Sequence, residues 1–129
     1  MIKKYLGIDY GTERFGLAIA DDESKTAVVC GTVSSVDDII DIAKKESIDV
    51  MVVGTPYSIV NKDNVLPKDF QKFKHTLAAA KGIKGIEIVF ADERLSSKYA
   101  DSLIGDKKTK AGRDEIAALS ILQNYLDRL

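Results

Sequence analysis

The run from Val50 to Val53 most constrains the fold, because it is wholly apolar, short, and ended by Gly54-Thr55-Pro56. A strand whose side chains are apolar on both faces is expected at the centre of a sheet that is covered on both sides. Parallel strands of this kind need crossover connections, which are usually helices. The run therefore predicts an α/β fold.

The surrounding segments give the order of the elements. Strands are predicted at residues 4–10, 14–20 and 27–33 before this run, and at residues 86–91 after it. Helices are predicted at residues 37–46, from Pro67 to Gly82, from Ser96 or Ser97 through Ile104, and from about residue 113 to the end. Three meandering strands followed by helix-linked strands imply a five-stranded mixed sheet with helices on both faces.

Composition excludes several classes of protein. The 129 residues suit one domain spanning 1–129, and the net charge of −1 does not indicate a strongly basic nucleic-acid-binding domain. No signal sequence or membrane-spanning run is recognisable, so a cytoplasmic protein without membrane partners is expected. Cys30 is predicted to be a small core residue, and His75 a surface residue without a function.

Acidic residues recur where predicted elements begin or end. Asp9 ends the first strand, Asp92 and Glu93 follow the last strand, and Asp114 and Glu115 begin the last helix. Carboxylates gathered from separate elements repel one another unless a cation or a proton compensates them. The pattern therefore favours a divalent-metal site.

The last helix indicates how one of these acids could reach the others. Ala118, Ile121 and Tyr125 follow Asp114 at helical spacing, so all four positions fall on one stripe of the helix. Ala117 and Ala118 are small enough to let this end of the helix approach the sheet. The simpler alternative is that Asp114 only favours a helix N-terminus.

Mg²⁺ or Mn²⁺ would suit such a site, because hard divalent cations prefer oxygen ligands and often bind phosphates as well. One or two such ions could support phosphodiester hydrolysis without a catalytic histidine. Four basic residues precede or open the last helix and could contact phosphates, although a solvated loop is the alternative: Lys107, Lys108, Lys110 and Arg113.

Four motifs together resemble the YqgF/RuvX family over nearly the whole chain. They are Gly7-Ile8-Asp9-Tyr10-Gly11-Thr12 with Arg14 and Gly16, Val53-Gly54-Thr55-Pro56, Asp92-Glu93-Arg94-Leu95-Ser96-Ser97, and Asp114-Glu115-Ile116-Ala117-Ala118. The resemblance implies an RNase H-like fold related to the RuvC resolvases. It also implies a nuclease that processes the 5′ end of pre-16S rRNA, with Holliday junction resolution as the older interpretation of the family.

The resemblance also assigns roles to individual positions. It implies that Asp9, Glu93 and Asp114 are the catalytic, metal-binding acids. Because neighbouring residues of a strand point to opposite faces, Glu93 is preferred to Asp92 as the ligand. The substrate backbone is expected to contact Thr12 and Arg14, with Arg94 orienting the region of Glu93.

Two departures from the family pattern affect substrate contacts. The loop at residues 57–63 contains no glycine, and Glu13 stands where a basic residue is common in the family.

Other functions are compatible with parts of the sequence. Sugar kinases, actin and heat-shock-70 proteins also place an aspartate and a glycine-threonine turn after their first strand, but this chain lacks a second glycine-rich phosphate turn. A catalytically silent scaffold that binds nucleic acid or ribosomal particles is a further alternative. A junction resolvase acting on branched DNA would be expected to work as a symmetric dimer, and the sequence leaves the oligomeric state open.

Overall fold

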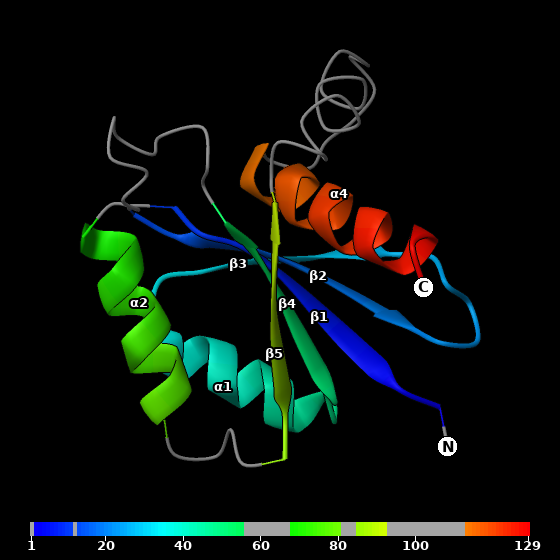
Figure 1. Cartoon of the computed structure of the whole chain (residues 1–129), viewed down its shortest axis with the longest axis horizontal. Helices are drawn as coiled ribbons and strands as arrows, with labels where there is room; N and C mark the ends of the chain where they lie inside the picture. Colours follow the sequence, from blue (N-terminus) through cyan, green and yellow to red (C-terminus); the bar gives the residue numbers. More distant parts are fainter. Residues whose placement is uncertain (1, 12, 56–67, 81–84, 93–112) are drawn as a thin grey trace.

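Five strands form one mixed sheet in the order β3-β2-β1-β4-β5 (Figure 1). The computed structural model describes residues 2–11, 13–55, 68–80, 85–92 and 113–129. The strands are β1 (Lys4–Asp9), β2 (Phe15–Asp21), β3 (Val28–Val33), β4 (Val50–Thr55) and β5 (Glu87–Asp92). β2 pairs antiparallel with β1 and β3, whereas β4 runs parallel to β1 and β5. The predicted mixed sheet is confirmed.

Helices cover both faces of this sheet. They are α1 (Val36–Lys45), α2 (Lys68–Ala79) and α4 (Arg113–Asp127). α1 and α2 lie on one face and α4 lies on the other (Figure 1). The predicted helix near Ile104 and the loop at residues 57–63 lie outside the described part of the chain.

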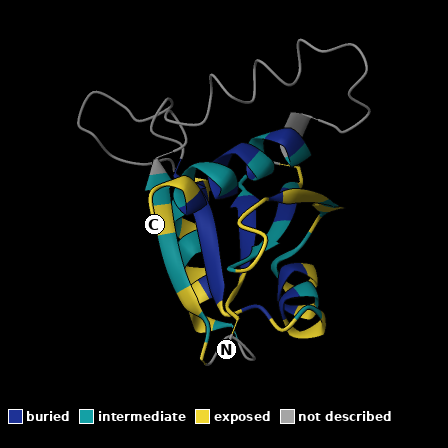
Figure 2. Cartoon of the chain, turned by 90° about the vertical axis from the view of Figure 1, so that its right-hand side faces the viewer, coloured by how far each residue is buried: buried dark blue, intermediate teal, exposed yellow. Residues whose placement is uncertain are grey.

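Side-chain alternation along the strands divides the core into two layers. On β1, Leu6 and Ile8 pack toward α1 and α2, whereas Tyr5 packs toward α4. β4 repeats this division, with Met51 and Val53 on the first side and Val52 on the second. Figure 2 shows the buried residues concentrated in the central strands and on the helix sides that face them. The wholly apolar run in β4 is explained because this strand is buried on both faces.

The edge strand β3 contains a β-bulge that the sequence did not predict. Leu17 pairs with Gly31 and Ala18 with Val29, so Cys30 is the extra residue, and Gly31 adopts a φ of 110°. Cys30 is half-buried against the core rather than fully buried as expected. Burial raises the pKa of its thiol, and the nearby Glu46 raises it further.

The amino-terminal ends of the parallel strands are tied together at the edge of the sheet opposite Asp9. The Asp49 carboxylate accepts a hydrogen bond from the Lys4 backbone N–H at 2.9 Å, and the Asp49 N–H donates to the Lys4 carbonyl. The Glu87 N–H donates to the Asp49 carbonyl at 3.0 Å. These bonds fix the register in which β1, β4 and β5 end together at the other edge.

Candidate active site

The carboxyl ends of β1, β4 and β5 meet at one edge of the sheet. Asp9 pairs with Gly54, and Thr55 pairs with Asp92. Ligands of open α/β sheets bind outside the carboxyl ends of the strands. The structure therefore brings the backbone positions of Asp9 and Asp92 to the edge where a site is expected.

Asp9 occupies the sheet face that α4 covers. Tyr5, two alternations earlier on β1, packs in the α4 layer, and a Cβ added at Gly7 would also meet α4. Alternate residues of a strand share a face, so Asp9 lies on this side as well. Its side chain is half-buried.

Both neighbours of Asp9 in the sheet are glycines. Gly16 faces it on β2 and Gly54 faces it on β4, and the next position along this row on β5 is Ala91. At these directly paired positions of the described strands, β2 and β4 therefore contribute only glycines beside Asp9.

α4 crosses the sheet so that its beginning points toward Asp9. Tyr125 packs against Tyr5 with ring centroids 6.1 Å apart, and Leu122 lies at Gly7. The helix thus runs antiparallel to β1. The backbone of Asp114 lies one turn before Ala118, about 5 Å farther toward the edge that holds Asp9.

Gly7 is what permits this close approach. A Cβ at position 7 would lie 2.7 Å from the Cβ of Leu122 and 2.9 Å from the carbonyl oxygen of Ala118. Ala118 and Ile121 are buried and Tyr125 packs against the same cluster, which confirms the predicted apolar stripe. The distance between α4 and the sheet therefore depends on the missing side chain at Gly7.

A short turn connects Asp9 to β2. A Cβ at Gly11 would collide with the carbonyl oxygen of Arg14, so this turn also requires a glycine. The Arg14 side chain is exposed, as a residue that binds substrate should be.

An aromatic cluster supports this end of the sheet on the opposite face. Tyr10 contacts Phe15, Phe70 and Phe73, with ring centroids 5.8, 5.4 and 5.2 Å away. Burial raises the pKa of the Tyr10 hydroxyl, and Asp69 raises it further. These contacts hold α2 against the residue that follows Asp9.

Several predicted site residues cannot be placed. Only the backbone positions of Asp114 and Arg113 are described, as the first residues of α4. Six others lie outside the described ranges: Thr12, Glu93, Arg94, Lys107, Lys108 and Lys110. Within those ranges, no three Asp, Glu, His or Cys side chains gather into a metal site.

Sequence reasoning missed the glycines that shape the site. Gly7, Gly16 and Gly54 belong to sequence motifs, but the motifs alone do not indicate a structural role for them. A glycine inside a strand is a signal for close approach of another backbone or a ligand. Read in that way, Gly7 would have indicated the contact with α4.

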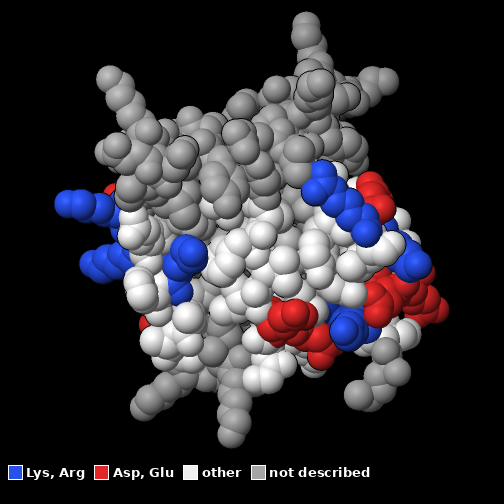
Figure 3. All heavy atoms as spheres, viewed as in Figure 1, with Lys and Arg blue, Asp and Glu red and all other residues white. Residues whose placement is uncertain are grey.

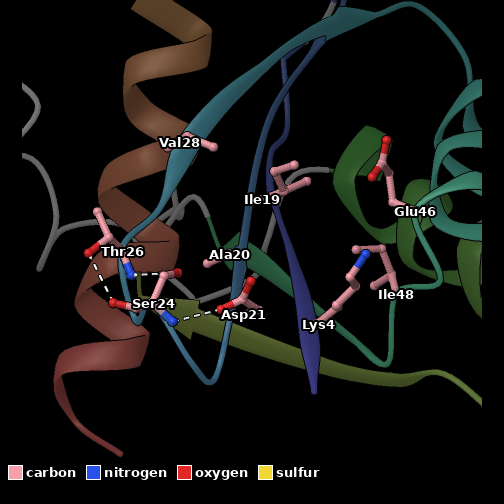
Figure 4. A pocket seen from close by; sticks show the side chains of 9 residues that line it. All are labelled: Lys4, Ile19, Ala20, Asp21, Ser24, Thr26, Val28, Glu46 and Ile48. Carbon is pink, nitrogen blue, oxygen red and sulfur yellow. Dashed lines mark hydrogen bonds between the residues drawn. The ribbon is translucent and has the colours of Figure 1, made fainter. Parts of the chain in front are cut away.

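A hollow of about 270 Å³ near the other end of β1 is not part of this site (Figure 4). Lys4, Asp21 and Glu46 line it, so its charges are of both signs. The Asp21 carboxylate already accepts a 2.7 Å hydrogen bond from the Ser24 N–H, and this bond lowers the pKa of Asp21. The hollow therefore offers no preference for an anionic substrate.

None of the described helices is both long enough and apolar enough to cross a membrane.

The comparisons with known proteins agree with this geometry. A family described as "RuvX: Holliday junction resolvase" matches residues 3–128. Proteins named "Putative pre-16S rRNA nuclease" from Endomicrobium trichonymphae and Staphylococcus aureus (strain JH9) are 31% and 34% identical, with 98% of this chain and 96% of each relative covered.

Solved structures show the same fold at low sequence identity. Thermus thermophilus RuvC in complex with a Holliday junction substrate has a TM-score of 0.67 at 14% identity, covering 98% of this chain and 94% of RuvC. The fowlpox virus resolvase bound to junction DNA has a TM-score of 0.57 at 12% identity, covering 99% and 98%. The fold is therefore the RNase H-like fold of the RuvC resolvases, as predicted.

Proposed function

The chain belongs to the RuvX family, and from this premise we propose that it is a metal-dependent nuclease that processes the 5′ end of pre-16S rRNA. It is a hydrolase that acts on phosphodiester bonds. The observation that carries the proposal is the position of Asp9, a half-buried carboxylate between two glycines at the carboxyl edge of the sheet.

The surroundings of Asp9 fit a hard divalent cation. The carboxylate supplies oxygen ligands, and Gly16 and Gly54 leave space beside it for a cation with its waters and a substrate phosphate. We propose that Asp9, Glu93 and Asp114 hold one or two Mg²⁺ or Mn²⁺ ions. When bound, such ions activate a water and stabilise the leaving oxygen of a phosphodiester.

The alternation along β5 supports Glu93 rather than Asp92 as the second acid. Val89 and Ala91 both pack in the layer that α4 covers. A residue two positions after Ala91 in an extended strand shares its face, whereas Asp92 is out of step with it. Position 93 is thus the one expected on the Asp9 side.

The basic residues around the site would hold the substrate backbone. Arg14 is exposed at the turn that follows Asp9. We propose that Arg14, Thr12 and Arg94 contact phosphates near the cleaved bond. The cluster before α4 would contact phosphates farther away: Lys107, Lys108, Lys110 and Arg113.

Precursor rRNA is preferred as the substrate because the relatives at 31% and 34% identity carry that name. Holliday junction resolution is the second candidate, favoured by the description of the matching family. The resolvase structures are too distant in sequence to decide between them. A resolvase would need two active sites related by a twofold axis to cut both strands.

The test is cleavage with Mg²⁺ or Mn²⁺ of a structured RNA with a precursor-like 5′ extension, beside a four-way DNA junction. Asp9→Asn, Glu93→Gln and Asp114→Asn should each abolish cleavage while preserving the unfolding midpoint, because the amide keeps the shape and removes the charge. Asp41→Asn, at an exposed position on α1, is the matched control and should cut normally.

Each outcome distinguishes one function from another. RNA cleavage that is lost in Asp9→Asn supports the processing nuclease, whereas cleavage confined to the junction supports the resolvase. Absence of cleavage by the wild type, with RNA binding retained, supports the catalytically silent scaffold.

The basic cluster before α4 makes a separate prediction. Replacing Lys107, Lys108 and Lys110 together by glutamine should weaken RNA binding and lower the slope of log affinity against log salt by about two. Affinity measured at four salt concentrations checks this. An unchanged slope would indicate that these lysines belong to a solvated loop and do not contact RNA.

A further inference from the structure

Phe90 is an exposed aromatic residue on an edge strand. Its side chain is 40% exposed on β5, the last strand of the sheet as described. The ring packs edge-on against Phe70 at 6.5 Å, and the Lys74 ammonium lies 4.6 Å from the ring centroid. The exposed part of the ring is removed from water only when another molecule binds over it.

Two hollows flank this ring, one on each face of the sheet. The hollow toward α4 has about 210 Å³ and is lined by Ala91, Tyr125 and Arg128 among others. The hollow toward α2 has about 380 Å³ and is lined by Gln71 and Lys74 among others. Phe90 lines both, so it forms the ridge between them.

The described residues that line the two hollows carry positive charge only. No Asp or Glu is among the described residues that line either hollow, whereas Lys74 and Arg128 each contribute a cation. Figure 3 shows an uncharged surface in the middle of this face, with Lys and Arg over α2 on the left and near the end of α4 on the right, and with Asp and Glu farther to the right and below the middle. An anion would therefore find cations on both sides of the ridge, although the chain as a whole has a net charge of −1.

This face is continuous with the candidate active site. Ala91 lines the hollow toward α4, pairs with Gly54, and so belongs to the row of small residues that begins at Asp9. Phe90 also lies only two residues, about 7 Å, before Asp92. The row therefore leads from Asp9 to Ala91 on β5, which lines the same hollow as Phe90.

We propose that the ridge at Phe90 binds an unpaired strand of the RNA substrate, with a base stacked on the Phe90 ring and phosphates on Lys74 and Arg128. This inference rests on the proposed function, because it names a second contact of the same substrate. Aromatic rings combined with flanking cations are how proteins bind single strands without reading their sequence. A duplex cannot use the ring in this way, because its bases are already stacked.

Lys74 would exchange partners when the strand binds. In the free protein its ammonium lies over the Phe90 ring. An exposed contact of this kind is weak, so a base can replace the ammonium, which then contacts the adjacent phosphate. The ring and the cation thus lie side by side before a nucleotide binds.

The test measures RNA binding in EDTA, where cleavage cannot occur. Fluorescence anisotropy with a labelled 12-nucleotide single strand and with an RNA hairpin compares the wild type with Phe90→Leu, Phe90→Trp and a Lys74→Gln/Arg128→Gln double variant. Lys44→Gln/Lys45→Gln on α1 is the control, because it removes the same charge from exposed positions on another surface.

Phe90→Leu should weaken single-strand binding at least about five-fold and Phe90→Trp should restore it, since a leucine fills the apolar contact but cannot stack. The Lys74→Gln/Arg128→Gln variant should lower the salt slope for the single strand by about 1.4, and the control variant should not. Hairpin binding should change little in Phe90→Leu.

The proposal is overturned if Phe90→Leu and the double variant bind the single strand like the control. It is also overturned if Phe90→Leu changes the sedimentation coefficient, since the ridge would then be an interface between copies of the chain. If only the proposal about the ridge is wrong, the wild type still shows metal-dependent cleavage, and Phe90→Leu binds the single strand normally. If only the proposed function is wrong, the wild type does not cleave, and Phe90→Leu still weakens single-strand binding.

Discussion

At the scale of single residues, glycines determine how closely α4 docks and what surrounds Asp9. Gly7 lets α4 contact β1 directly, and Gly16 and Gly54 are the residues paired with Asp9 on the two neighbouring strands. The acids were recognisable from the sequence because they recur at the ends of several predicted elements. The glycines beside them were not, because register across strands is not written locally in the sequence.

Gly7→Ala should destabilise the protein and reduce cleavage. The added methyl group meets Leu122 and the backbone of Ala118, so α4 must move outward. We expect a loss of about 1–3 kcal/mol in the free energy of unfolding, as for other overpacked cores. Urea denaturation and cleavage rates measure the two effects, with exposed Lys44→Ala as control. Unchanged stability would show that α4 does not press on Gly7.

Tyr5 gives the protein a pH-dependent contact at the other end of β1. Its hydroxyl donates a 2.6 Å hydrogen bond to the Asp22 carboxylate, and this bond, more than burial, raises the pKa of Tyr5 to about 12. Because the pKa in the folded state exceeds the ordinary tyrosine value of 10.0, the contact stabilises the fold fully below pH 10. The contribution is lost as pH rises through 12.

Tyr5→Phe should therefore cost about 1 kcal/mol at pH 7, and the difference from the wild type should shrink above pH 10. Urea denaturation at pH 7, 9, 10 and 11 measures it. Tyr125→Phe, which alters the other ring of the same pair, is the control for loss of a hydroxyl. A constant difference between Tyr5→Phe and the wild type at all four pH values would contradict the assignment.

At the scale of elements, periodicity predicted nearly every described strand and helix to within two residues. The predicted strand at residues 27–33 was right in extent but not in geometry, because the bulge at Cys30 depends on its partner strand. The sequence also suggested more burial of this strand than the structure shows. β3 is an edge strand, so Val28 and Val29 are 52% and 40% exposed despite their apolar sequence.

The cap of α1 is a prediction that the structure makes specific. The sequence offered Ser34 and Ser35, and the structure selects Ser35, whose Oγ accepts a 3.1 Å hydrogen bond from the Asp38 N–H. Ser35→Ala should lower the free energy of unfolding by about 1 kcal/mol. Ser34→Ala is the matched control and should have a smaller effect. Equal losses in thermal or urea denaturation would show that the cap is shared.

At the scale of the whole molecule, the proposed site draws on segments far apart in the sequence. Asp9 belongs to β1, Asp92 ends β5, and Asp114 begins α4. The order of elements allowed the sheet and its two covered faces to be predicted, because few topologies satisfy three meandering strands followed by crossovers. The residues that flank Asp9 in the sheet followed only after the pairing register was known.

The sheet should open from its edges inward. β1 and β4 are central and buried on both faces, whereas β3 is an edge strand with exposed side chains. Native-state hydrogen exchange should therefore find the amides of Leu6, Ile8 and Val52 protected to nearly the full free energy of unfolding, and those of β3 less protected. Uniform protection across the five strands would contradict this.

The docking of α4 also determines when, during folding, the enzyme becomes complete. The Gln123 side chain accepts a 2.9 Å hydrogen bond from the Ala27 N–H and donates to the Lys25 carbonyl, joining residues 96 and 98 positions apart. Contacts of such long range form late, after the local meander of β1 to β3. A chain cut after Asp92 should accordingly show no cleavage and should bind an apolar dye through its uncovered sheet face. The proposed cleavage activity is therefore expected only after the last helix has been synthesised and has docked.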